Sequence, residues 1–105
     1  MPTIVTGKYQ VLAADTSAGT TAARVTTGLT HIKALQIVEP ISGLGDQGSN
    51  AYTTDEMQGV EPGSFVHLGM VKAAGLILAD GGVFIASHPS LIRKGATYFW
   101  EARGD

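Results

Sequence analysis

Residues 72–87 read KAAGLILADGGVFIAS and contain the clearest local signal in the chain. Two short apolar runs flank an Asp-Gly-Gly tripeptide at 80–82, and these residue types tolerate the positive φ angles of tight hairpin turns. The alternative is a helix over 70–79 capped by Gly81, but Gly75 within it and Gly69 beside it weigh against a helix, where each glycine costs about 1 kcal/mol relative to alanine. The sequence therefore favours a β-hairpin here.

Five other segments have the alternation or the β-branched content of strands. They are KYQVLAA (8–14), ARVTTGL (23–29), THIKALQIVEP (30–40), SFVHLGMV (64–71) and TYFWEAR (97–103). Together with the hairpin they give about seven short strands with turn signals between them. This pattern predicts an all-β fold, namely an antiparallel β-sandwich or barrel that forms a single domain over residues 1–105.

Two of these strands carry apolar residues on both faces. In 30–40, Leu35 and Ile37 lie on one face, and Ile32, Ala34 and Val38 lie on the other. A strand with this pattern is buried on one face and covered by a neighbouring chain or element on the other. In 97–103, Tyr98, Trp100 and Ala102 alternate with Thr97, Phe99, Glu101 and Arg103.

Residues 42–63, SGLGDQGSNAYTTDEMQGVEPG, form one long irregular stretch with four acidic residues and no basic one. Loops of this length are uncommon in compact domains and are often functional or disordered. Leu44, Tyr52, Met57 and Val60 are apolar anchors that a solvated linker seldom carries. We therefore expect an arm that packs on something, with a flexible surface loop as the alternative.

The composition restricts the class of protein. The 105 residues are 44% hydrophobic and only 15% charged, with a net charge of −2 and no cysteine. So few charges leave apolar surface that oligomerisation or docking would bury, unless Thr, Ser and Gln cover it instead. The balance of charge predicts no nucleic-acid binding. The sequence has no run of about 18 apolar residues, so we expect no membrane span. Residues 1–10 lack the charged start and apolar run of a signal peptide, so we expect none.

Signals for catalysis are weak. The three histidines, His31, His67 and His88, lack the spacing of a zinc site. The sequence contains no Gly-x-Ser-x-Gly elbow, no calcium-loop order of acids and no phosphate-binding lysine motif. We therefore expect a non-enzymatic protein with no cofactor and no metal, and a small hydrolase or metal enzyme that uses these histidines and the acidic loop is the rival hypothesis.

The chain ends on Arg103-Gly104-Asp105. This tripeptide can act as an adhesion signal, but recognition of that kind needs it held out on a tight loop. Here it begins inside the last expected strand, where Arg103 can pair with an acid or cover Trp100. We interpret it as a strand end.

Two segments, ARVTTGLTHIKALQIVEP (23–40) and GATYFWEARG (95–104), resemble small β-rich proteins of tailed bacteriophages. Those proteins often start a central strand with VTTGL and close on an aromatic strand that ends in Ala-x-Gly. The resemblance implies a virion component, including decoration or cement proteins that bind outside the capsid lattice. It assigns structural roles to the residues that match: Thr26, Thr27, Gly28, Trp100 and Ala102.

The composition and the resemblance together predict a capsid decoration or cement subunit. It would be made in the cytoplasm of the bacterial host, bind the major capsid protein on the exterior of the virion, stabilise the shell and form a homo-oligomer, with a trimer plausible. The residues expected at its interfaces are Ile4, Val5, Leu35, Ile37, Leu44, Tyr52, Met57 and Val60. The alternative is a head-fibre or tail adhesion module that binds carbohydrate, in which Tyr52, Tyr98 and Trp100 stack on sugar rings if they are exposed.

Overall fold

The structure is a computed structural model, and it describes residues 3–10, 22–40, 49–93 and 96–105. Its elements are β1 (Thr3–Gln10), β2 (Ala23–Thr26), β3 (Ile32–Glu39), β4 (Ser49–Thr54), α1 (Asp55–Val60), β5 (Phe65–His67), β6 (Met70–Lys72), β7 (Leu76–Ala79), β8 (Val83–Ala86), a 3₁₀-helix (Pro89–Leu91) and β9 (Thr97–Gly104). The described part of the chain contains no helix that is long and apolar enough to cross a membrane.

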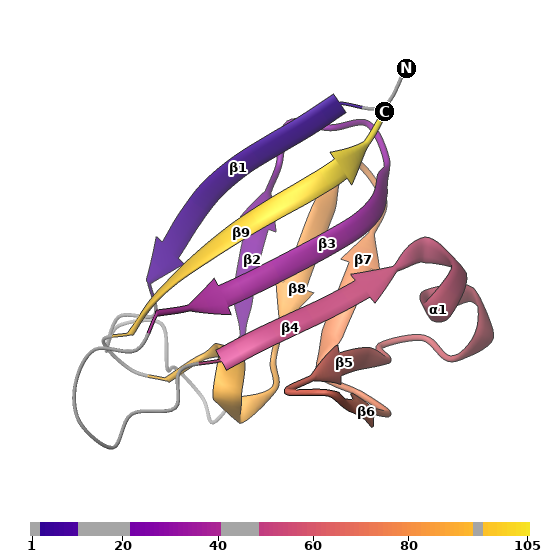
Figure 1. Cartoon of the computed structure of the whole chain (residues 1–105). Helices are drawn as coiled ribbons and strands as arrows, with labels where there is room; N and C mark the ends of the chain where they lie inside the picture. Colours follow the sequence, from indigo (N-terminus) through magenta and orange to yellow (C-terminus); the bar gives the residue numbers. More distant parts are fainter. Residues whose placement is uncertain (1–2, 11–21, 41–48, 94–95) are drawn as a thin grey trace.

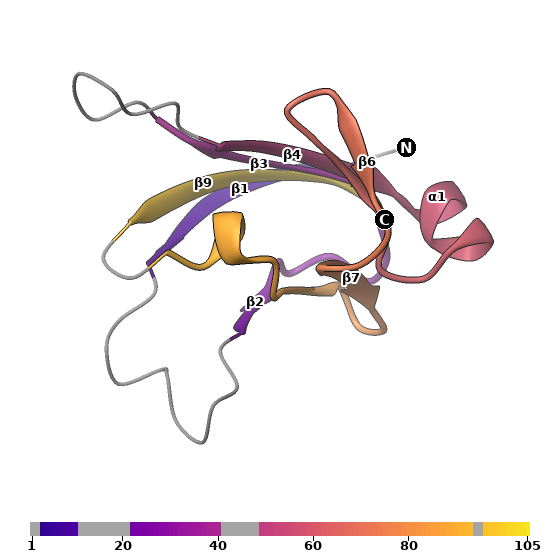
Figure 2. The same ribbon diagram turned by 90° about the horizontal axis from the view of Figure 1, so that it is seen from below.

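Two antiparallel sheets make up the molecule (Figure 1). One has six strands in the order β1-β9-β3-β4-β5-β6, and the other has three in the order β2-β8-β7. Seen from below, the larger sheet lies above the smaller one and α1 lies at one end (Figure 2). The prediction of an all-β antiparallel fold is confirmed, and the arrangement is that of a sandwich.

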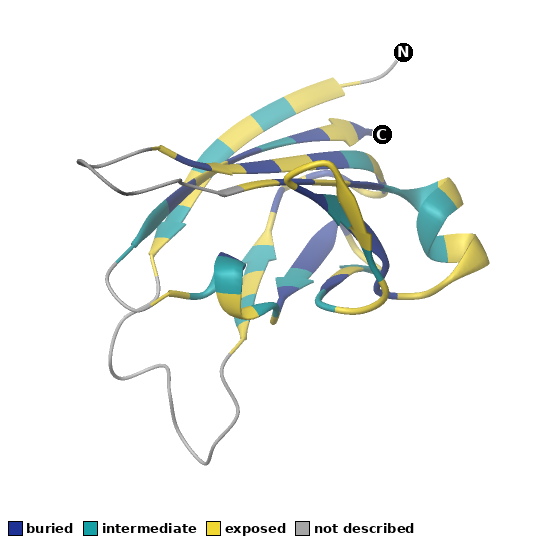
Figure 3. Ribbon diagram, turned by 60° about the horizontal axis from the view of Figure 1, so that its bottom comes forward, coloured by how far each residue is buried: buried dark blue, intermediate teal, exposed yellow. Residues whose placement is uncertain are grey.

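The core lies between the two sheets, where dark blue positions gather in Figure 3. Its largest side chains include Tyr98 and Trp100 of β9, Phe65 of β5 and Phe84 of β8. Phe84 meets the Trp100 ring edge to face, with ring centroids 5.7 Å apart. The alternation predicted for β9 is therefore correct, since every second residue from Tyr98 to Gly104 is buried.

The hairpin predicted from residues 72–87 is confirmed, and the alternative helix is wrong. β7 and β8 pair from Leu76 opposite Ala86 to Ala79 opposite Val83. Gly81 and Gly82 have φ angles of 82° and 73°, which residues other than glycine rarely adopt. A Cβ on Gly82 would also lie 1.8 Å from the carbonyl oxygen of Leu29, so only glycine fits there.

The prediction of a long irregular stretch at 42–63 is wrong for residues 49–60, which form β4 and α1. In β4, Ala51 and Thr53 point into the core while Tyr52 is exposed, so this strand follows the ordinary alternation. Thr54 then ends the strand and caps the helix, because its hydroxyl accepts a hydrogen bond from the Met57 amide (3.1 Å). Residues 42–48 lie outside the described part.

Two predicted strands have different limits in the structure. The segment 64–71 is not one strand: β5 and β6 are separated by a turn at residues 68–69. The first strand starts earlier than the predicted 8–14, since β1 covers Thr3–Gln10, and residues 11–14 are not described. The strands expected in 23–29 and 30–40 are confirmed as β2 and β3, and Pro40 follows the end of β3.

Candidate functional site

The turn between β5 and β6 has an unusual residue at its tip. His67 pairs with Met70, which leaves Leu68 and Gly69 as a two-residue loop. Their φ angles are 50° and 82°, and Leu68 is the only non-glycine residue with a positive φ in the described part of the chain. Turns of this kind prefer Asn, Asp or Gly at both positions, because a Cβ in left-handed backbone costs about 1–2 kcal/mol. Leucine is therefore held here at an energetic cost.

The same turn exposes a group of apolar side chains. Leu68, Met70 and Val71 are 52%, 64% and 70% exposed, and we call residues 68–71 the apolar hairpin. The Leu68 amide donates a hydrogen bond to the carbonyl oxygen of Asn50 (3.1 Å), which fixes the base of the turn on β4. The side chains are thus presented on an ordered backbone rather than on a loose loop.

Two histidines pack beneath this hairpin. His67 at the end of β5 is buried, and its ring centroid lies 5.4 Å from that of His88, which precedes the 3₁₀-helix. Phe65 contacts both rings edge to face. Sequence spacing did not suggest this pair, because the two residues are brought together by the approach of the 3₁₀ segment to β5. Such a contact has no local signal.

The histidine pair favours neutral imidazoles. Burial lowers the pKa of His67, and the nearby Lys72 lowers it further. Burial also lowers the pKa of His88, with smaller contributions from His67 and Lys72. The Nδ1 atom of His88 accepts a hydrogen bond from the Ser90 amide (3.2 Å), which caps the 3₁₀-helix. His88 thus caps the 3₁₀-helix with one ring nitrogen while its ring packs against His67 and Phe65.

The third histidine, His31, lies apart from the pair of His67 and His88. His31 lies 3.2 Å from Asp55 in an exposed pair between the start of β3 and the start of α1. Within the described ranges, no group of three or more histidine or acidic side chains is placed to hold a metal ion. The described histidines and acids therefore do not assemble the metal centre of the rival hypothesis.

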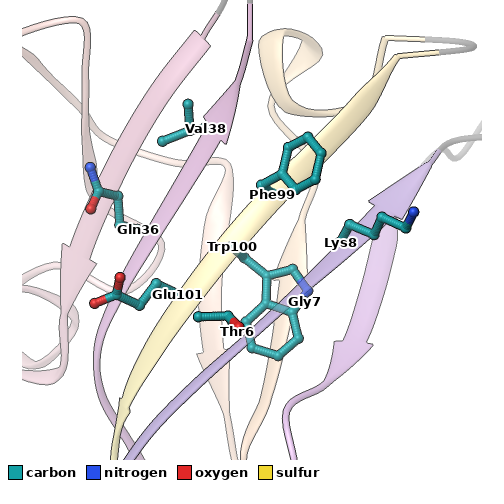
Figure 4. A pocket seen from close by; sticks show the side chains of 8 residues that line it. All are labelled: Thr6, Gly7, Lys8, Gln36, Val38, Phe99, Trp100 and Glu101. Carbon is teal, nitrogen blue, oxygen red and sulfur yellow. The ribbon is translucent and has the colours of Figure 1, made fainter.

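A second surface feature lies on the outer face of the six-stranded sheet. A cleft of about 470 Å³ is lined by residues of β1, β3 and β9: Thr6, Gly7, Lys8, Gln36, Val38, Phe99, Trp100 and Glu101. In Figure 4, Phe99 extends from β9 between Val38 and Lys8, and Gln36 lies beside Glu101. A smaller cleft of about 160 Å³ adjoins it, since Gln36 and Glu101 line both. We call these two clefts together the sheet groove.

Gly7 allows Trp100 to pack against β1. The two residues are opposite each other in the register of β1 and β9. A Cβ on Gly7 would lie 2.5 Å from Cζ2 of the indole, so a larger residue would push the ring away. Tyr98 and Trp100 do not meet the condition for stacking on sugar rings, because both side chains are buried, whereas Tyr52 is exposed.

The residues predicted for interfaces have different positions. Leu35 and Ile37 were wrongly assigned, because they point from β3 into the core and are 1% and 0% exposed. Ile4, Tyr52 and Val60 are exposed, whereas Val5 and Met57 are half-buried. Leu44 lies outside the described residues. The apolar hairpin was not among the predicted residues, although Gly69 after Leu68 was a turn signal.

The terminal tripeptide is held within the sheet. Arg103 donates to Glu101 (3.1 Å), and Lys33 forms an ion pair with Asp105 (3.1 Å). The Asp105 carbonyl oxygen also accepts from the backbone amides of Thr30 and His31. This arrangement agrees with its interpretation as a strand end.

A polar cluster fixes the 3₁₀ segment to β9 and β3. The carboxylate of Glu39 is buried and forms an ion pair with Arg93. The hydroxyl of Tyr98 donates to the Ser90 carbonyl (2.9 Å) and accepts from the Arg93 amide (2.9 Å). Tyr9 stacks on Tyr98 at 5.0 Å, and burial raises the pKa of Tyr9 well above its usual range. These side chains therefore stabilise the contact between the 3₁₀ segment and the strands.

No protein-family model, curated protein or solved structure matches this chain.

Proposed function

We propose that this protein is a non-enzymatic structural subunit of a tailed-phage virion, a decoration or cement protein that docks on the major capsid protein through the apolar hairpin. The phage assignment derives from the sequence resemblance at 23–40 and 95–104. The docking surface derives from the structure, and the observation that carries it is Leu68.

Leu68 departs from two local preferences at once. It is an exposed leucine, and it occupies left-handed backbone in which Asn would be more stable. Residues that break local rules without a compensating contact inside the fold are found mainly at functional sites. Burial of Leu68 in a partner would provide the compensation, because covering the 52% of this residue that is exposed contributes about half of the 1.5–3 kcal/mol or so of a fully buried leucine.

The apolar hairpin is small, so one docking event would be weak. Leu68, Met70 and Val71 cover much less than the 1,200–2,000 Å² or so of a standard stable interface. On a shell, a subunit that is itself oligomeric engages several sites, and the effective concentration of the second contact is high. Weak hairpin contacts therefore suffice for retention if the protein is a homo-oligomer.

The outer edge of β1 is the surface that we propose for contact between copies. Among the described strands, β1 pairs with β9 alone, so alternate residues between Thr3 and Tyr9 direct main-chain donors and acceptors away from β9. An edge of this kind can pair with a second chain. Ile4 is exposed on β1, as expected for a residue at an interface. Light scattering after size exclusion measures the resulting oligomer, and whether it is a trimer stays a prediction.

Co-sedimentation with empty heads assembled from the major capsid protein of the same phage tests the docking. Wild-type protein should pellet with the heads, and Leu68→Asn should weaken binding by about three- to tenfold, since Leu68 is 52% exposed and docking can gain about half of the 1.5–3 kcal/mol or so of a fully buried leucine. The matched control is Ile77→Thr, which removes an exposed apolar residue from β7 and should leave binding unchanged. If the wild type stays in the supernatant, or Leu68→Asn binds as well as the wild type, the proposal is wrong.

A further inference from the structure

The sheet groove differs from the apolar hairpin in chemistry. Its two ends carry aromatic rings, Phe99 at 47% and Tyr52 at 44% exposure. Between them lie the amide of Gln36 and the carboxylate of Glu101, which line both clefts. Lys8 borders the larger cleft and Arg103 the smaller one. Apolar rings alternate here with groups that donate and accept hydrogen bonds.

The strand register fixes the spacing of these groups. Glu101, Gln36 and Tyr52 lie opposite one another on β9, β3 and β4, and Phe99 lies opposite Val38 in the row two residues away. With strands about 4.8 Å apart and about 3.4 Å of rise per residue, the Cα atoms of Phe99 and Tyr52 are about 12 Å apart. The two rings can therefore contact different units of one extended ligand.

The polar groups at the centre are held in place by the fold. Both Nε and Nη2 of Arg103 donate to Oε1 of Glu101 (3.1 Å each). The Gln36 amide donates to Oδ1 of Asn50 on β4 (3.5 Å). These contacts orient a carboxylate and an amide toward the outer face, where they can accept from and donate to hydroxyl groups.

We propose that the sheet groove binds an oligosaccharide; its source, a bacterial cell surface, rests on the proposed function as a phage protein. Sugar rings present C–H faces that pack on exposed aromatic rings, and their hydroxyl groups pair with amide, carboxylate and ammonium side chains. Phe99 and Tyr52 contact two sugar units of the chain, and Gln36, Glu101 and Lys8 bind the hydroxyls between and beside them. This activity is additional to capsid docking and uses a different face of the protein.

The groove binds the sugar without cleaving it. Glycoside hydrolysis needs two carboxyl groups on either side of the scissile bond. In the described lining of the two clefts, Glu101 is the one carboxylate, and Arg103 neutralises it. A subunit that is displayed on a particle and binds such a glycan would hold the particle near the cell that carries the glycan.

An array of purified bacterial surface glycans tests the proposal. Wild-type protein should be retained on one or more glycans, and Phe99→Ala and Tyr52→Ala should each weaken retention by about tenfold, which corresponds to about 1.4 kcal/mol. Both residues are exposed, so the two variants should keep the wild-type circular dichroism spectrum and melting temperature. Gln36→Leu, which keeps the size of the side chain, should lower retention without changing the fold.

Leu68→Asn is the control that separates this proposal from capsid docking. It should bind glycans like the wild type, and Phe99→Ala should pellet with empty heads like the wild type. The glycan proposal is overturned if no glycan retains the wild type, or if folded Phe99→Ala and Tyr52→Ala variants are both retained as well as the wild type. Either result leaves the test of capsid docking unaffected.

Discussion

Two tight hairpin turns in the described part of the chain each place two consecutive residues in left-handed backbone, but they use different residue types. The turn between β7 and β8 places Gly81 and Gly82 at φ angles of 82° and 73°, whereas the turn between β5 and β6 places Leu68 and Gly69 at 50° and 82°. The first uses the residue type that left-handed backbone favours. The second holds an exposed leucine in a conformation that costs about 1–2 kcal/mol.

The two turns also differ in the contacts that they make with the rest of the fold. The Gly82 carbonyl oxygen accepts from both the amide and the hydroxyl of Thr27 (2.9 and 2.6 Å), so the β7–β8 turn is packed against the segment after β2. Around Gly69, by contrast, a Cβ would meet no heavy atom within 4 Å. The β7–β8 turn is therefore stabilised by contacts within the fold. The β5–β6 turn contains a strained residue and presents its apolar side chains to solvent.

The largest expected effect is that of Gly82→Ala. A methyl group would lie 1.8 Å from the Leu29 carbonyl oxygen and also occupy left-handed backbone. Backbone displacement and the positive φ together should lower the free energy of unfolding by at least about 3 kcal/mol. Urea denaturation measures this value. Gly81→Ala is the control, because it has the strain but no overlap, and an equal loss in both variants would refute the packing argument.

A smaller effect is expected for Gly69→Ala at the tip of the apolar hairpin. The methyl group meets no neighbour, so only the strain of left-handed backbone remains, about 1 kcal/mol. The same urea titration measures it. A loss as large as that of Gly82→Ala would mean that the β5–β6 turn is packed as tightly as the β7–β8 turn, contrary to the comparison.

Leu68→Asn should stabilise the protein. Asparagine tolerates left-handed backbone better than leucine, and Leu68 is 52% exposed, so the change should raise the free energy of unfolding by up to about 1 kcal/mol. Thermal denaturation measures the gain in isolated protein. A destabilised Leu68→Asn variant would show that the leucine serves the fold of the free subunit rather than a partner.

The smallest expected effect is a dependence of stability on pH that arises from His67 and His88 beside the β5–β6 turn. Burial lowers the pKa of His67 and of His88, so the unfolded chain binds more protons than the folded one below the ordinary histidine value of about 6.5. The contribution of the neutral His67–His88 pair to the free energy of unfolding is therefore fully present above that pH and declines as the pH falls below it. Melting temperatures at pH 7.5 and 5.5 should differ less in His67→Gln than in the wild type.

Much of the fold was predictable because its signals are local. The β7–β8 hairpin follows from the glycines at 81 and 82, and the alternation in 97–103 predicts which side of β9 is buried. β4 and α1 were not predicted, because they depend on contacts distant in sequence. The Gln58 side chain of α1, for example, donates a hydrogen bond to the carbonyl oxygen of Leu76 on β7 (2.8 Å).

The candidate sites could be predicted less well than the fold from the sequence. Leu68 fits the alternation of Val66 and Met70, so the segment was interpreted as one strand and the turn was missed. Phe99 was correctly placed on the face opposite Trp100. That Phe99 shares a groove with Gln36 and Glu101 follows only from the register between β9 and β3. Leu35 and Ile37 were assigned to an interface because an apolar pattern does not distinguish the core from a contact between chains.

Hydrogen–deuterium exchange of the protein, free and bound to empty heads, tests the central claim most directly. The account predicts that amides of residues 65–72 become protected on binding, while those of the β7–β8 turn at 80–82 keep the exchange rates of the free protein. Protection at 80–82 with no change at 65–72 would contradict it.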